Sequence, residues 1–195
     1  GSEMCIRDSP KTENIHRIEL EEEQRKLYLA AVVDARDKLQ AAKPEDKMAV
    51  FAVLMRLREI CCDPRLIVDG WEGGSAKLDA CIELVASAVE GGHRILLFSQ
   101  FTSMLELLAK RLDEEGVSHF TLQGSTPKPV RAELVRRFNG GEVSVFLISL
   151  RAGGTGLNLT AADIVIHYDP WWNVAAQNQA TDRAYRIGQK NPVQV

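Results

Sequence analysis

The sequence predicts an α/β fold in which helices cover both faces of a parallel sheet. Short apolar segments, of the kind that form buried strands, recur along the second half of the chain at residues 94–98, 118–122, 143–149 and 163–168. Amphipathic segments that predict helices precede, separate or follow them, at residues 76–89, 102–115, 127–138 and 174–187. Because strands and helices alternate with short loops, we expect a parallel sheet. The crossovers between its strands should be right-handed.

The residues before this alternating part predict a helical extension over 10–74, which leads into an α/β lobe over 75–195. Within the extension, helical patterns run on either side of Pro44, at residues 21–42 and 45–61. A loose alternation over 13–19 predicts a short strand. Ser75 stands where its hydroxyl can cap the first helix of the lobe.

Both ends of the chain suggest a piece of a larger protein. Residues 1–9, GSEMCIRDS, continue no predicted element, and we interpret them as a non-native tag or an artefact. Residues 192–195 resemble the start of a strand. We therefore expect the natural protein to extend beyond this chain.

Composition limits the possible partners. Hydrophobic residues make up 45% of the chain, enough for a core, and the formal net charge is −3. An acidic balance means that any nucleic-acid contact needs a local basic patch. No run of eighteen apolar residues occurs, so no membrane span is predicted. The four cysteines lack the spacing of a zinc site or a disulfide framework, and we expect free thiols and no metal held by the chain.

Three polar segments follow predicted strands: Ser99–Gln100, Gln123–Thr126 and Arg151–Gly156. In an open parallel sheet, ligands bind at the carboxyl ends of the strands, so these segments predict a binding site. Each segment also has an ordinary structural interpretation. The first two can cap the helices that follow them, and the glycines can form a tight turn.

The last predicted helix carries Gln179, Arg183 and Arg186 at spacings of four and three residues, which place them on one helix face. Guanidinium groups bind phosphate oxygens in a two-pronged geometry, and the backbone amides of a glycine-rich turn bind them as well. The alternative is a solvated helix with an ion pair between Asp182 and Arg186, worth ~0.3–0.5 kcal/mol. That pair does not account for the shared face with Gln179.

Several strings resemble successive motifs of the C-terminal ATPase lobe of Swi/Snf-type DNA translocases in helicase superfamily two. They are, in order, FSQF, LQGSTPKPVRAELVRRFN, AGGTGLNL, DPWWN and QATDRAYRIGQ. The resemblance extends over about residues 10–190 and implies a RecA-like lobe. The last two strings look like those of the bacterial branch. The family usually has proline after the asparagine of DPWWN, where this chain has Val174.

The resemblance implies the second lobe of a motor that hydrolyses ATP and moves along double-stranded DNA. By resemblance, the catalytic residues are Gln179, Arg183 and Arg186. Nucleotide contacts are expected from Gly154, Gly156, Asp182, Arg183 and Arg186. DNA contacts are expected from Ser99, Gln100, Ser125, Thr126, Lys128, Gly153, Thr155 and Trp172.

The sequence contains neither the phosphate loop G-x-x-x-x-G-K-[ST] nor an acidic box at a strand end. In the family these motifs lie on the N-terminal lobe, so the resemblance implies that ATP and Mg²⁺ are held mainly by such a lobe of the same protein. We therefore expect the isolated chain to be inactive. The expected partners are that lobe, duplex DNA and, as the family allows, a nucleoprotein. The expected location is the cytoplasm in a bacterium and the nucleus in a eukaryote.

Two other functions stay open at this point. A lobe of a strand-separating helicase shares the fold, but its sixth motif usually has other residues beside the arginines than the RIGQ found here. A non-catalytic docking module would keep the fold without the motor, and the retained Gln179, Arg183 and Arg186 argue against it.

Overall fold

The computed structural model describes residues 11–152, 157–170, 174–182 and 192–195. The chain divides into two compact units. One, here called the sheet unit, is formed by residues 1–16 and 82–195. The other, here called the hairpin unit, is formed by residues 17–81.

Within the described residues, the sheet unit contains six parallel strands in the spatial order β1-β6-β5-β2-β4-β3. Their bounds are Lys11–Thr12 (β1), Ile95–Ser99 (β2), His119–Leu122 (β3), Val145–Ser149 (β4), Ile164–His167 (β5) and Val193–Gln194 (β6). The central strand β2 pairs with β4 and β5, so Leu97 lies opposite both Leu147 and Ile166. The predicted parallel α/β sheet is confirmed.

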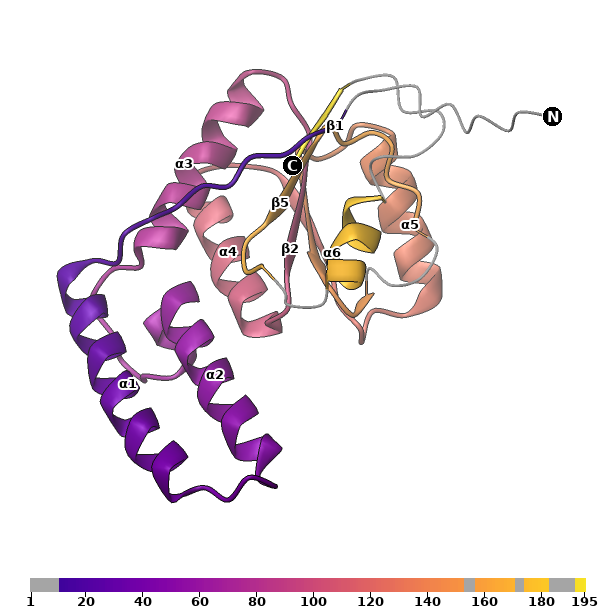
Figure 1. Ribbon diagram of the computed structural model, residues 1–195. Coiled ribbons are helices and arrows are strands. Elements are labelled where there is room, and N and C mark those ends of the chain that lie inside the picture. Colours follow the sequence, from indigo (N-terminus) through magenta and orange to yellow (C-terminus); the bar gives the residue numbers. More distant parts are fainter. Residues whose placement is uncertain (1–10, 153–156, 171–173, 183–191) are drawn as a thin grey trace. The chain divides into compact units, whose positions relative to one another are not determined.

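Helices cover both faces of this sheet, as Figure 1 shows. One face carries α4 (Thr102–Glu114) and the C-terminal part of α3 (Ala76–Glu90). The other face carries α5 (Lys128–Asn139) and α6 (Val174–Thr181). The apolar face predicted for α4 is confirmed, because its four members are fully buried: Met104, Leu105, Leu108 and Leu112.

An aromatic cluster joins α5 to the sheet. The ring of Phe146 on β4 lies 5.3 Å from that of Phe138 on α5 and 6.1 Å from that of Phe120 on β3. The guanidinium of Arg94 lies 4.2 Å from the centroid of the Phe138 ring. It also donates hydrogen bonds to the carbonyl oxygens of Phe138 and Val143, so its charge is held inside the fold at the amino end of β2.

The edge of the sheet differs from the sequence prediction. The strand predicted over 13–19 is wrong, because the pairing residues are Lys11 and Thr12, opposite Val193 and Gln194, and residues 13–21 form no regular element. In the predicted stretch, Ile15 and Ile18 are 84% and 39% exposed. These apolar side chains do not pack in the core, so their alternation with polar residues does not mark a buried strand. The strand suspected at the C-terminus is present as β6.

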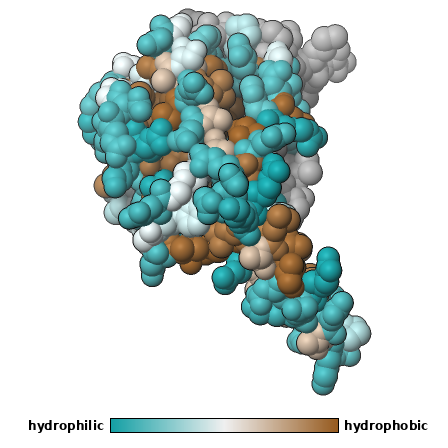
Figure 2. Space-filling view, turned by 90° about the vertical axis from the view of Figure 1, so that its left-hand side faces the viewer, coloured by the Kyte–Doolittle hydropathy of each residue, from teal (hydrophilic) through white to brown (hydrophobic). Residues whose placement is uncertain are grey.

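The hairpin unit is built on two antiparallel helices, α1 (Glu22–Ala41) and α2 (Lys47–Cys62), as predicted. A short 3₁₀ helix, Pro64–Leu66, and the first residues of α3 complete it. Apolar surface interrupts the polar surface of these helices in Figure 2. The exposed apolar residues include Leu29, Val33, Met48, Phe51 and Leu54. Among the described residues, no helix is long and apolar enough to cross a membrane.

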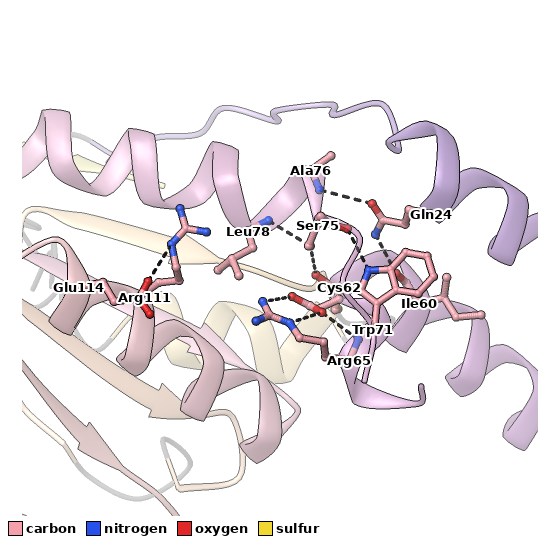
Figure 3. Close-up of polar contacts among 12 residues, drawn as sticks. Gln24, Ile60, Cys62, Arg65, Trp71, Ser75, Ala76, Leu78, Arg111 and Glu114 are labelled. Carbon is pink, nitrogen blue, oxygen red and sulfur yellow. Dashed lines mark hydrogen bonds and ion pairs between the residues drawn. The ribbon is translucent and has the colours of Figure 1, made fainter. Parts of the chain in front are cut away.

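A buried glutamine connects the helix ends of the hairpin unit (Figure 3). Gln24 is fully buried in the first turn of α1. Its amide nitrogen donates to the carbonyl oxygen of Ile60 at 2.9 Å, and its amide oxygen accepts from the backbone N–H of Ala76 at 3.4 Å. Backbone groups at helix ends have no partner within their own helix. One side chain thus satisfies the end of α2 and the start of α3.

Ser75 makes the second connection at this junction. Its hydroxyl donates to the carbonyl oxygen of Cys62 at 2.8 Å and accepts from the backbone N–H of Leu78 at 3.4 Å. The second contact is the cap that the sequence predicts for α3. Because Ser75 is 4% exposed, water has little access to replace either contact.

We predict that Ser75→Ala lowers the free energy of unfolding by about 2 kcal/mol, because it removes a helix cap and leaves a buried carbonyl oxygen without its donor. Urea denaturation monitored by circular dichroism measures this change. Ser103→Ala, at an exposed position of α4, is the matched control and should cost less than about 0.5 kcal/mol. Equal losses in the two variants would contradict the prediction.

Candidate functional site

The carboxyl ends of four neighbouring strands, β5, β2, β4 and β3, lie along one edge of the sheet. The polar segments predicted to converge there follow β2, β3 and β4, and Asp169 follows β5. This convergence follows from the parallel pairing, since parallel strands end at the same edge. We call this edge the carboxyl edge.

A buried carboxylate joins the ends of β2 and β5. The Oδ2 atom of Asp169, which is 3% exposed, accepts the backbone N–H of Gln100 at 3.0 Å. The backbone N–H of Tyr168 donates to the carbonyl oxygen of Phe98 at 3.0 Å, which extends the pairing of the two strands past β5. The backbone at Gln100 is therefore fixed from the β5 side.

The side chain of Gln100 is the unusual feature of the carboxyl edge. Its amide nitrogen and amide oxygen are both buried, and neither has a hydrogen-bond partner among the described residues. Native proteins satisfy nearly all buried polar atoms, and an amide without partners is costly. A donor and an acceptor are thus buried without a partner at the end of β2.

Two serine hydroxyls at the same edge are engaged in local turns. Ser99 is fully buried, and its Oγ accepts the backbone N–H of Phe101 at 3.1 Å. Ser149, 3% exposed, accepts the backbone N–H of Ala152 at 3.2 Å. Ser99 therefore shapes the turn before α4, close to the structural interpretation that the sequence allowed. Its contact with DNA stays a prediction.

The loop after β3 is closed by Thr126. Its Oγ1 accepts the backbone N–H of Gln123 at 3.0 Å, and its own N–H donates to the carbonyl oxygen of Gln123 at 3.1 Å. No side-chain cap is present on α5, so the Ser/Thr cap that the sequence offered as an alternative is not formed. Ser125 and Lys128 are exposed beside this loop.

Arg131 braces the same loop, a role that the sequence did not predict. Its Nε donates to the carbonyl oxygen of Thr126 at 3.0 Å, and its Nη2 donates to that of Gly124 at 3.1 Å. A second arginine near the carboxyl edge, Arg151, is exposed just after β4. It begins the predicted segment Arg151–Gly156 but was not named among the individual DNA or nucleotide contacts. Both arginines lie in segments that the sequence analysis singled out, but the sequence alone gave neither of them a role of its own.

Helix α6 presents one predicted residue to solvent. Gln179 is exposed, whereas the next two residues, Ala180 and Thr181, are 3% and 2% exposed. The helical pattern continues to Asp182, whose N–H donates to the carbonyl oxygen of Asn178 at 2.9 Å and which is half-buried. The other predicted site residues lie outside the described residues: Gly153, Gly154, Thr155, Gly156, Trp172, Arg183 and Arg186.

Comparison with known proteins identifies the family. The conserved-domain family described as "Helicase conserved C-terminal domain" matches residues 76–188, more than half of the chain. A structure described as the Sulfolobus solfataricus SWI2/SNF2 ATPase core in complex with dsDNA superposes with a TM-score of 0.83 at 30% identity, over 95% of this chain and 40% of that one. The chain belongs to the SWI2/SNF2-type helicase C-terminal family. The resemblance and the RecA-like fold predicted from the motifs are both confirmed.

Relatives of this helicase C-terminal domain come from distant organisms. The putative ATP-dependent helicase/translocase YwqA of Bacillus subtilis is 38% identical over 200 residues, which cover 99% of this chain and 22% of that protein. A human relative is also 38% identical over 200 residues, which cover 95% of this chain and 19% of that protein. It is the SWI/SNF-related matrix-associated actin-dependent regulator of chromatin subfamily A member 1. The chain thus spans about a fifth of these relatives. Since the identities are equal, the bacterial branch stays a prediction.

Proposed function

We propose that the chain is the second motor lobe of an ATP-dependent translocase that moves along double-stranded DNA. In this role the carboxyl edge contacts the phosphate backbone, and the segment after α6 supplies arginines to ATP bound on another lobe. A relative of similar fold is described as binding dsDNA, which supports the DNA part of the proposal. Relatives named as ATP-dependent helicases support the ATP part.

The buried amide of Gln100 carries the DNA part of the proposal. Both amide atoms are covered in the structure, so a ligand would reach them only after a local movement of the side chain. Once exposed, the Gln100 Nε2–H would donate to a phosphodiester oxygen, and Oε1 would accept from a water bound to the backbone. The exposed groups nearby, Ser125, Lys128 and the uncapped start of α5, suit the same anionic ligand. Such contacts read the shape and charge of the backbone, so the binding is independent of sequence.

For ATP hydrolysis, we propose that this chain supplies one half of an active site that is shared between two lobes. The sequence contains no phosphate loop, and the described residues contain no group of three His, Cys, Asp or Glu that could hold a metal ion. ATP and Mg²⁺ would thus be held mainly by the other lobe. This chain would contribute the amides of Gly154 and Gly156 and the side chains of Gln179, Asp182, Arg183 and Arg186. The guanidinium groups would stabilise the charge that develops during phosphoryl transfer.

The decisive test is Arg186→Ala in the complete protein. We expect kcat for DNA-stimulated ATP hydrolysis to fall by about 10³-fold or more, because the lost charge acts mainly on the transition state. Arg186→Lys should recover little of the loss, since a point charge does not reproduce a planar fork. Steady-state phosphate release at saturating ATP and DNA measures both variants.

Arg136→Ala is the matched control, because Arg136 is an exposed arginine whose partner is Glu133 on the same helix. It should leave kcat within about twofold. A kcat near that of the wild type in Arg186→Ala would remove Arg186 from the catalytic residues. A collapse of the melting temperature in that variant would instead assign it a structural role.

For Gln100→Met we predict opposite effects on stability and binding. Removing an unsatisfied buried amide should leave the free energy of unfolding unchanged or raise it by about 1 kcal/mol, while duplex DNA affinity falls about fivefold. Because the lost group is neutral, the dependence of affinity on salt should not change. Lys128→Ala, in contrast, should reduce the salt slope by about 1. Fluorescence anisotropy with a labelled duplex at several salt concentrations measures the affinity and its salt dependence for both variants. An unchanged affinity in Gln100→Met would contradict a contact between Gln100 and DNA.

A further prediction concerns the chain in isolation. Without a phosphate loop it should release no phosphate from ATP above background, with or without duplex DNA. Adding the N-terminal lobe of the same protein in trans or by fusion should restore DNA-stimulated release. Robust turnover by the isolated chain would refute the composite site.

A further inference from the structure

A polar contact joins the carboxyl end of β5 to the C-terminal end of α6. The Nε2 atom of His167, the last residue of β5, lies 2.8 Å from the Oγ1 atom of Thr181, the last residue of α6. Thr181 is 2% exposed. A directional bond of this length is therefore present where α6 passes into the segment that carries Arg183 and Arg186.

The surroundings of His167 hold its ring in one place. The ring stacks on Phe98 of β2, with centroids 5.6 Å apart and an interplanar angle of 20°. Burial, and to a smaller extent the charge of the nearby Lys11, lowers the pKa of His167 to about 4, against the opposing effect of Glu13. The imidazole is thus neutral near pH 7. A neutral ring and a hydroxyl form one hydrogen bond whichever of the two groups donates.

Packing alone does not fix a short helix as tightly as catalysis requires. Apolar contacts are non-directional and tolerate small rotations and shifts of a helix over a sheet. Ala180 supplies such a contact, since it is 3% exposed and packs in the core. The hydrogen bond of the Thr181 hydroxyl is directional, so it restricts the rotation of α6 in a way that the apolar contact of Ala180 does not. Functional groups must be held within about 0.5 Å of their productive position, and supporting hydrogen bonds are the usual means.

We propose that His167 and Thr181 are positioning residues for ATP hydrolysis, whose hydrogen bond fixes the rotation of α6, the helix that carries Gln179 and that leads in the sequence to Arg183 and Arg186. This inference rests on the function proposed above for Arg183 and Arg186. Neither His167 nor Thr181 contacts the reacting atoms in this role. Both act through the placement of α6, and a displacement of about 1 Å is enough to cost up to about 10²-fold in rate.

Four variants of the complete protein separate positioning from packing. His167→Phe keeps an aromatic ring against Phe98 but removes the nitrogen, and Thr181→Val keeps the side-chain shape but removes the hydroxyl. We expect each to lower kcat at least about tenfold, with KM for ATP and duplex affinity within about twofold. Thr181→Ser keeps the hydroxyl and should retain kcat near the wild-type value. The double variant should lose less than the product of the two single losses.

Hydrogen exchange of the peptide that contains residues 174–182 gives a readout independent of activity. Exchange should be faster in His167→Phe and Thr181→Val than in the wild type, and unchanged in Thr181→Ser. Unchanged exchange in the first two variants, losses in Thr181→Ser equal to those in Thr181→Val, or a normal kcat in His167→Phe overturns the proposal. Arg186→Ala in the same assay keeps the failures apart. If it retains activity, the proposed function fails; if it is inactive while His167→Phe is normal, only the positioning role fails.

Discussion

The pairing of β2 with a parallel strand on each edge is the constraint on which the sheet unit depends. All residues of β2 and of its neighbour β4 are buried, which requires helices on both faces of the sheet. Parallel strands also end at the same edge, so the polar residues that follow β2, β3, β4 and β5 must come together there. One pattern of backbone hydrogen bonds thus produces both the core and the position of the candidate site.

At the carboxyl edge, the side chains that shape the backbone differ from a buried amide without a partner and from an exposed lysine. The hydroxyls of Ser99, Ser149 and Thr126 accept backbone N–H groups within their own turns, so their first role is to hold those turns closed. The amide of Gln100 is buried and has no partner among the described residues. Lys128 is exposed at the start of α5. The structure therefore separates residues that the motifs alone treat as equivalent.

Local patterns predicted the elements well, because hydrophobic periodicity is a property of neighbouring residues. The buried strand β4 and the apolar face of α4 are examples. Interactions between distant residues were not predictable. Arg131 resembles any solvated arginine until the fold places the loop carbonyls against it. The desolvation of Gln100 depends on other strands, and Lys11–Thr12 becomes a strand because residues 193–194 supply its partner. The roles of Arg183 and Arg186 remain predictions from their motif.

The charge distribution in the sheet unit bears on how such a lobe would hold DNA. Arg94 and Arg131 donate to backbone carbonyl oxygens, so two guanidinium charges are used within the fold in a chain whose net charge is −3. Among the proposed DNA contacts, Lys128 is the one cation. These contacts would therefore displace few counterions and keep the affinity low, whereas a neutral donor such as Gln100 would add binding that salt screens little. A motor advancing along a duplex must release each phosphate contact at every step. In the proposed function, weak and largely neutral contacts would allow fast release, and a second lobe would have to hold the DNA while this lobe releases it.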